Sequence, residues 1–131
     1  MTTNKLVYMV CTLAATLTRA TAFNNSTLSD IAGFNALTQV LMQLQITQNY
    51  ALTDLSGFDS LQQVGAQISI TNNAALPLCK AQSIVTQVED AGGLGSGGAV
   101  LTGNDDPCDP DPCSAGVCAP DCSESGLYSC Q

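Results

Sequence analysis

Cysteines carry the most obvious chemistry in this sequence. Seven are present, and five of them fall within residues 108–130 among Asp, Pro, Ser and Gly. Cysteines crowded in this way are typical of a disulfide framework formed in an oxidising compartment. A zinc site is the alternative, but such sites commonly use Cys-x-x-Cys pairs, and the sequence contains none. The pattern therefore predicts disulfides and no metal-ligating residues.

The remaining composition gives little support to catalysis. The 131 residues include no His, which is the side chain best suited to proton transfer near neutral pH and the base of the usual Ser-His-Asp triad. The glycine-rich segment 92–98 is a poor phosphate-binding loop, because no Lys-Ser or Lys-Thr pair ends it and a strand is expected after it. We expect no catalytic residues, no cofactor and no enzymatic activity.

Carboxylates cluster in the segment 104–113, where Asp is interspersed with Pro and Cys. Clustered carboxylates can bind calcium, and this interpretation stays open, although the Gly and Glu required by an EF-hand loop are missing. Acidic and proline-rich segments are also typical of extended, solvated linkers, which is the interpretation we favour. Over the whole chain, 11 acidic residues against 3 Lys and Arg give a net charge of −8. This balance argues against nucleic acid and anionic membranes as partners.

The N-terminus has the features of an export signal. Lys5 precedes an apolar run at 6–17, and Ala20-Thr21-Ala22 is a small-x-small cleavage pattern. The run is shorter than the ~20 residues that a transmembrane helix needs. We therefore expect residues 1–22 to be a signal peptide, no transmembrane segment, and an extracellular or cell-surface location. The alternative is that residues 1–22 are retained and cap the domain.

Exported chains can also be glycosylated at Asn-x-Ser/Thr. Asn24 and Asn25 each begin such a sequence.

An internal repeat organises the middle of the chain. Leu28-Ser-Asp-Ile-Ala-Gly-Phe34 returns 24 residues later as Leu52-Thr-Asp-Leu-Ser-Gly-Phe58, and a third copy opens at Leu76. The apolar positions that recur, and that we expect to point inward, are Leu28, Ile31, Phe34, Leu37, Val40, Leu44 and Ile46, then Leu52, Leu55, Phe58, Leu61, Val64, Ile68 and Ile70. One such unit cannot bury its apolar face alone, so we expect the units to stack.

Each unit contains a strand with alternating polar and apolar residues, 43–47 and 67–71. Each strand is followed by an asparagine, and the next unit, after a helix expected at 81–90 and a glycine-rich turn, ends in the same way. Stacking would align these residues into a ladder of Asn49, Asn73 and Asn104. Residues 19–25 could form a degraded earlier strand, because Asn25 lies 24 residues before Asn49. Cleavage after Ala22 would cut through that strand.

The pattern Leu-x-x-Leu-x-Gly-Phe-x-x-Leu-x-x-Val, followed by Leu/Ile-x-Ile-Thr-x-Asn, resembles the receptor L-domain repeat of leucine-rich surface proteins, including bacterial ones. The resemblance covers about residues 21–104. It implies a mainly β fold: a short right-handed β-solenoid of 24-residue repeats at 23–106, with one short helix and a disulfide-rich C-terminal tail. The array is much shorter than a receptor L domain, and Leu41-Met42 replaces the glycine that follows Val64 in the second repeat.

The acidic, cysteine-rich tail at 107–131 is similar to the start of an EGF-like module. The similarity rests on Asp111-Pro-Cys-Ser-Ala-Gly-Val-Cys118 and on Tyr128-Ser-Cys130. An EGF-like module has further cysteines after this point, so the tail is either an abbreviated module or part of a longer one.

Cys79 occupies a core aliphatic position of the repeat, and the last expected strand ends shortly before Cys108. Adjacent strands lie ~4.8 Å apart, which is within the reach of a disulfide. We therefore expect a Cys79–Cys108 bridge that closes the C-terminal end of the core.

These features predict a non-catalytic, secreted or cell-surface recognition module. Its expected partner face is the outer side of the strands, and the partner is an unknown protein or glycan. The residues of that face are Gln45, Thr47, Ser69, Thr71 and Thr102. The alternative is a structural spacer or a self-associating matrix or envelope component. Threonine also suits any exposed strand position, so its presence alone does not decide between these functions.

Overall fold

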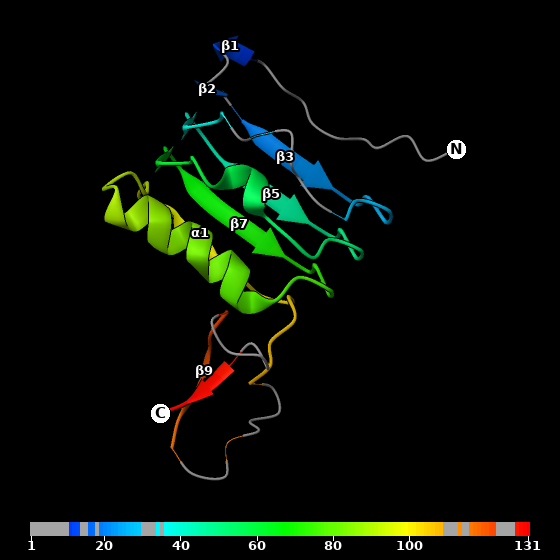
Figure 1. The fold of residues 1–131 in the computed structure, drawn as a ribbon. Coiled ribbons are helices and arrows are strands. Elements are labelled where there is room, and N and C mark those ends of the chain that lie inside the picture. The colour runs from blue at the N-terminus through cyan, green and yellow to red at the C-terminus, as the bar shows by residue number, and fades with distance from the viewer. Residues whose placement is uncertain are drawn as a thin grey trace.

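The fold is known from a computed structural model that describes residues 11–13, 16–17, 19–29, 34, 36–108, 113, 116–122 and 128–131. These residues form a mainly β structure with one α-helix (Figure 1). They also form three disulfides. Strand β1 (Cys11–Leu13) and the cysteine-rich tail lie at opposite ends of the molecule.

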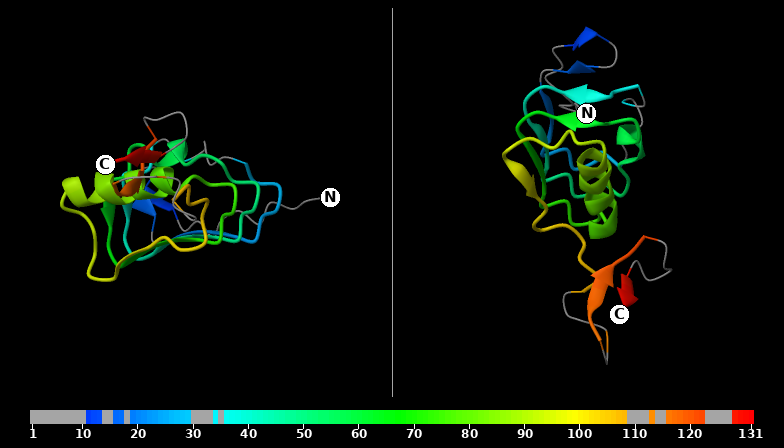
Figure 2. Two further views of the ribbon diagram at one scale, coloured as in Figure 1. Left: turned by 90° about the horizontal axis from the view of Figure 1, so that it is seen from below. Right: turned by 90° about the vertical axis from the view of Figure 1, so that its left-hand side faces the viewer.

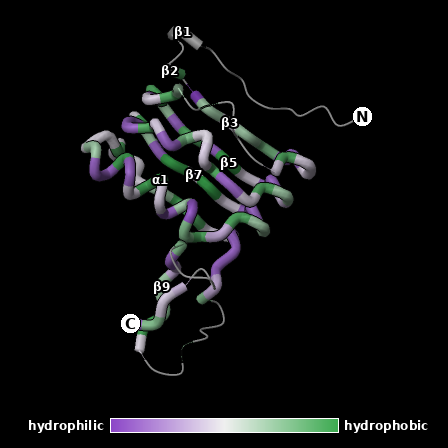
Figure 3. The backbone as a smooth tube through the Cα atoms, viewed as in Figure 1, coloured by the Kyte–Doolittle hydropathy of each residue, from purple (hydrophilic) through white to green (hydrophobic). Residues whose placement is uncertain are grey.

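The first sheet contains the long strand of each repeat. Its order is β3 (Ala20–Phe23), β5 (Leu44–Thr47), β7 (Gln67–Thr71) and β8 (Gly98–Val100), and every neighbouring pair is parallel. The register aligns Ala22 with Ile46 and Ile46 with Ile70, so the 24-residue repeat of the sequence is also the spacing of the sheet. Hydrophobic and hydrophilic residues alternate along β5 and β7 (Figure 3).

The second sheet contains a short strand of each repeat, in the order β1, β2 (Thr16–Leu17), β4 (Gln39–Val40) and β6 (Gln63–Val64). Strands β2, β4 and β6 are parallel, whereas β1 pairs with β2 in the antiparallel sense. Each repeat therefore supplies one strand to each sheet, and the chain turns between them within three residues, 41–43.

The core contains the apolar residues that the repeat aligns. Every residue predicted to point inward is buried, apart from Ile31, which lies outside the described residues. The rings of Phe34 and Phe58 stack with their centroids 5.4 Å apart. Phe58 ends the 3-10 helix η2 (Ser56–Phe58). The aromatic position of one repeat thus packs on the same position of the next.

Helix α1 (Leu78–Asp90) begins three residues before the expected segment 81–90 and ends where expected. Its buried residues Ala81, Ile84 and Val88 recur at helical spacing and join the core. The side chain of Gln87 donates hydrogen bonds to Phe58 O at 2.9 Å and to Leu61 O at 2.6 Å. These bonds fix the helix to the second repeat. No helix among the described residues is long and apolar enough to cross a membrane.

The tail forms an antiparallel hairpin of β9 (Cys118–Pro120) and β10 (Tyr128–Cys130), and it extends away from the repeats (Figure 2). Its disulfides are Cys108–Cys118 and Cys113–Cys130, and Cys79 of α1 is bonded to Cys122.

The expected Cys79–Cys108 bridge is therefore wrong. The expectation assumed strand-to-strand spacing, but Cys79 lies in the first turn of α1 and not in a strand. The tail turns back after β9 so that Cys122 reaches the helix, while Cys108 bonds within the tail.

The N-terminal strands belong to both sheets. Leu17, Ala20 and Ala22 are buried, and β3 pairs with β5 along its full length. Residues 1–10 lie outside the described part of the chain. Cleavage of a signal peptide after Ala22 stays a prediction, and it would remove β1, β2 and three of the four residues of β3. The alternative, in which residues 1–22 are retained, keeps these strands in the two sheets.

Candidate functional site

The parallel register arranges the outward residues of the first sheet in rows across its strands. One row, called here the central row, contains Thr21, Gln45, Ser69 and Val100. A second, the threonine row, contains Phe23, Thr47 and Thr71. Gln43 and Gln67 form a third, shorter row. The three rows contain no charged residue.

The two threonine hydroxyl groups of the threonine row are hydrogen-bonded to each other. The hydroxyl oxygens of Thr47 and Thr71 lie 2.8 Å apart. Thr47 is only 6% exposed, so the expectation that it faces water is wrong. Its in-register neighbours Phe23 and Thr71 flank it on both sides. Thr102 is exposed and extends the alignment, because its carbonyl accepts a hydrogen bond from Asn72 N at 2.9 Å.

The glutamine row is also internally bonded. Gln43 Nε2 donates to Gln67 Oε1 at 3.5 Å, and Gln67 Nε2 donates to Gly97 O at 3.3 Å. These contacts extend from β5 towards β8.

The central row is different. Thr21, Gln45 and Ser69 are partly exposed, and within the described part of the chain none of their side chains makes a hydrogen bond. Their amide and hydroxyl groups are therefore available to a ligand. Two large apolar side chains are exposed on the same face, Phe23 at 49% in β3 and Val100 at 39% in β8. Uncharged polar groups and one exposed aromatic ring thus lie together on one face of the sheet.

The asparagine ladder holds the ends of these strands. Asn49 Oδ1 accepts from Asn25 N, Asn73 Oδ1 from Asn49 N, and Asn104 Oδ1 from Asn73 N, at 3.0–3.3 Å. The amide nitrogens of Asn49, Asn73 and Asn104 donate to Ala22 O, Ile46 O and Ile70 O. The ladder expected of Asn49, Asn73 and Asn104 is present, and Asn25 extends it by one rung. It fixes the spacing of the rows.

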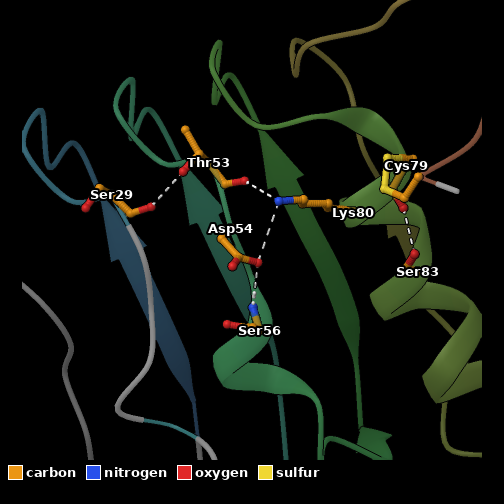
Figure 4. Close-up of polar contacts among 8 residues, drawn as sticks. Ser29, Thr53, Asp54, Ser56, Cys79, Lys80 and Ser83 are labelled. Carbon is orange, nitrogen blue, oxygen red and sulfur yellow. Dashed lines mark hydrogen bonds and ion pairs between the residues drawn. A yellow bond between two sulfur atoms is a disulfide. The ribbon is translucent and has the colours of Figure 1, made fainter. Parts of the chain in front are cut away.

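A second polar cluster joins the repeats to α1 (Figure 4). Lys80 Nζ donates to Thr53 O at 3.1 Å and lies 3.9 Å from Asp54 Oδ1, which also accepts from Ser56 N. Thr53 N in turn donates to Ser29 O of the preceding repeat. The side chains of Lys80 and Asp54 are 36% and 45% exposed, and pairs with this exposure contribute roughly 0–1 kcal/mol. The cluster therefore positions the helix and offers no catalytic arrangement.

The glycine-rich segment lines a groove of about 430 Å³ together with Gln62 and Gln63. Its backbone is already used for pairing with β6: Val64 N donates to Gly93 O, and Gly95 N donates to Val64 O. These amides cannot cradle a phosphate. Among the described residues no group of three or more Cys, Asp or Glu side chains could hold a metal ion.

No protein-family model, curated protein or solved structure matches the chain. The candidate site therefore rests on its geometry alone.

Sequence reasoning placed Gln45, Ser69 and Thr71 correctly beside one another but missed Thr21, Phe23 and Val100. The 24-residue spacing between Asn25 and Asn49, and the 31-residue spacing between Asn73 and Asn104, point to the strands that carry these three residues, but the spacings were used only to predict the asparagine ladder. The earlier strand expected at 19–25 is present as β3 (Ala20–Phe23). The competing assignment of residues 1–22 to a signal peptide kept Thr21 and Phe23 out of the expected partner face.

Proposed function

We propose that this chain is a non-catalytic, exported recognition module whose outer sheet face binds a neutral glycan. In this proposal residues 1–22 are retained, so that β3 stays in the sheet. The stacked repeats form a short right-handed β-solenoid of the receptor L-domain type. The tail is an EGF-like segment attached to the end of that solenoid.

The register supports the solenoid. The 24-residue offset holds in the first sheet from β3 to β7, and the second sheet keeps the same offset between β4 and β6. A chain that alternates between two parallel sheets with a constant offset advances by one layer per repeat, as solenoid repeats do.

The chemistry of the central row supports a neutral glycan. Uncharged amide and hydroxyl groups cost less to desolvate than charged ones, and they can bond the hydroxyl groups of a sugar. Phe23 adds an exposed apolar ring at one border of the row. Protein interfaces usually depend on Trp, Tyr or Arg anchors, and the three rows contain none of these residues. This absence of anchors is the observation that favours a glycan over a protein.

Three disulfides support export, because such bonds persist in oxidising compartments and are rare in reducing ones. Disulfides also stabilise small secreted domains whose cores are limited in size.

The proposal is tested by charging the central row. The purified chain is passed over an immobilised panel of neutral polysaccharides. Gln45→Lys places an ammonium group in the middle of the row and should weaken binding at least tenfold. Gln62→Lys makes the same chemical change at an exposed position outside the rows and should bind as the unaltered chain does.

Equal binding by the two variants would refute the assignment of the face. If none of the polysaccharides retains the chain, the proposal that the ligand is a neutral glycan is refuted. Concentration-dependent self-association that Gln45→Lys abolishes would instead favour the matrix-component alternative.

A further inference from the structure

The only two Asn-x-Ser/Thr sequences of the chain overlap, at Asn24-Asn25-Ser26 and Asn25-Ser26-Thr27. Sequence alone does not separate them, and both asparagines lie in the turn that follows β3. The structure places their two side chains in opposite environments.

Asn25 belongs to the asparagine ladder. It is 5% exposed, and its backbone N–H donates to Asn49 Oδ1 at 3.1 Å. A sugar on its amide nitrogen would have to displace buried neighbours, including the rung formed by Asn49. Modification of Asn25 is therefore incompatible with the folded repeat.

Asn24 is exposed and stands at a corner of the chain. Its φ of 53° is shared by Gln48 (58°) and Asn72 (57°) at the equivalent positions of the next two repeats. Asn tolerates this left-handed conformation better than most residues. Its backbone N–H donates to Thr47 O at 3.0 Å, so the corner is held by the main chain. The side chain makes no hydrogen bond within the described residues, and a substituent on it would disturb nothing that holds the fold.

We propose that Asn24 is the site of N-linked glycosylation and that Asn25 is not. The inference rests on the export part of the proposed function. The co-substrate is a lipid-linked oligosaccharide diphosphate. Asn24 Nδ2 forms a bond to the anomeric carbon of the first sugar, the lipid diphosphate leaves, and the amide loses one proton.

A glycan at Asn24 has a structural consequence. Asn24 follows β3, which is an outer strand of the sheet in the described part of the chain. Bulky, solvated groups beside an outer strand oppose pairing with another molecule. The glycan therefore protects this border while leaving the central row accessible on β5 and β7.

The overlap allows a matched test in which neither asparagine is altered. Ser26→Ala removes only the first acceptor sequence, and Thr27→Ala removes only the second. Both side chains are exposed, and neither makes a hydrogen bond within the described residues. The full chain and the two variants are produced in a eukaryotic secretory host, and intact masses are compared before and after treatment with peptide-N-glycosidase.

We expect the secreted unaltered chain and Thr27→Ala to carry one glycan, and secreted Ser26→Ala to carry none. Deglycosylation in heavy-oxygen water should label residue 24. Secreted chain without a glycan, or with a glycan on Asn25, would overturn the inference and leave export intact. Accumulation of the chain in the cytosol would contradict export, and the acceptor assignment with it.

Discussion

At the scale of single residues, the buried asparagines matter most. A parallel strand that ends leaves backbone groups without partners, and such groups must be hydrogen-bonded when they are buried. Asn73 is fully buried and supplies both a donor and an acceptor to the backbone of the preceding repeat. Its amide nitrogen donates to Ile46 O at 3.0 Å, and its oxygen accepts from Asn49 N at 3.0 Å. Each rung therefore joins two consecutive repeats.

We expect Asn73→Ala to lower the free energy of unfolding by about 3 kcal/mol or more, because it leaves at least two buried backbone groups unpaired at roughly 1–3 kcal/mol each. Chemical denaturation with the disulfides intact measures this change. Ser69→Ala, on the outer face of the same sheet, is the control and should change stability by less than about 0.5 kcal/mol. Similar effects for the two variants would show that the ladder does not hold the repeats.

The asparagine ladder was predictable from the spacing of the asparagines, because an Asn side chain at the end of a strand typically hydrogen-bonds neighbouring backbone groups. The burial of Thr47 was not predictable in this way. The alternation of polar and apolar residues indicates which face of the sheet a side chain is on, but it does not indicate how far the neighbouring side chains on that face shield it from solvent. Phe23 and Thr71 are the in-register neighbours of Thr47, and Phe23 was assigned to a position just after the presumed cleavage site.

At the scale of elements, the corners between the two sheets set how closely the repeats approach. A Cβ on Gly65 would lie 2.0 Å from Leu41 O, a main-chain atom that cannot move aside. Gly65 N also donates to Val40 O at 2.9 Å. The glycine of the second repeat therefore lies directly against the corner of the first, and Leu41-Met42 is tolerated there because those side chains point outward and are exposed.

We expect Gly65→Ala to destabilise the chain by about 3 kcal/mol, the upper end of the range for overpacking. Gly92→Ala is the matched control. A Cβ there meets nothing within 4 Å, although φ is +73°, so only a backbone cost of about 1 kcal/mol applies. The midpoints of urea denaturation separate the two variants. A larger effect for Gly92→Ala would contradict the close approach of the repeats at Gly65.

The element boundaries were predicted less well than the repeat itself. Helix α1 begins at Leu78, directly after its N-cap residue Pro77, whose φ of −57° and ψ of 131° place it just outside the helix. The glycine-rich segment was expected to be a turn, yet Leu94 within it bridges to Val64 in parallel. Such pairing is not visible in a hydropathy pattern, because glycines have no side chains and so show no alternation of polar and apolar residues.

At the scale of the whole molecule, the Cys79–Cys122 bridge connects the repeats to the tail. It joins residues 43 positions apart, whereas Cys108–Cys118 joins residues 10 apart. Pairing among many cysteines is decided by the folded chain, which is why neither spacing nor composition predicted it. The tail reaches α1 through this bond and helps line a cleft of about 460 Å³ along the helix.

Replacing both Cys79 and Cys122 with Ala should lower the stability of the repeats by about 4 kcal/mol on the loop-entropy model. The Cys108→Ala/Cys118→Ala double variant opens a loop that lies wholly within the tail, and it should leave the repeats nearly unchanged. Hydrogen exchange of amides in β5 and β7 reports on the repeats alone. Equal protection in both double variants would argue that Cys79–Cys122 is not the structural link.

The central claim, that the outer sheet face is a ligand site, is tested most directly by NMR titration. The isotopically labelled chain is titrated with a neutral oligosaccharide taken from the polysaccharide that retains it most strongly. We predict that the largest amide and side-chain shift changes occur at Thr21, Gln45 and Ser69, and that they saturate together. Shift changes that spare these residues and concentrate on α1, the tail or the groove at Gln62 and Gln63 would contradict the account.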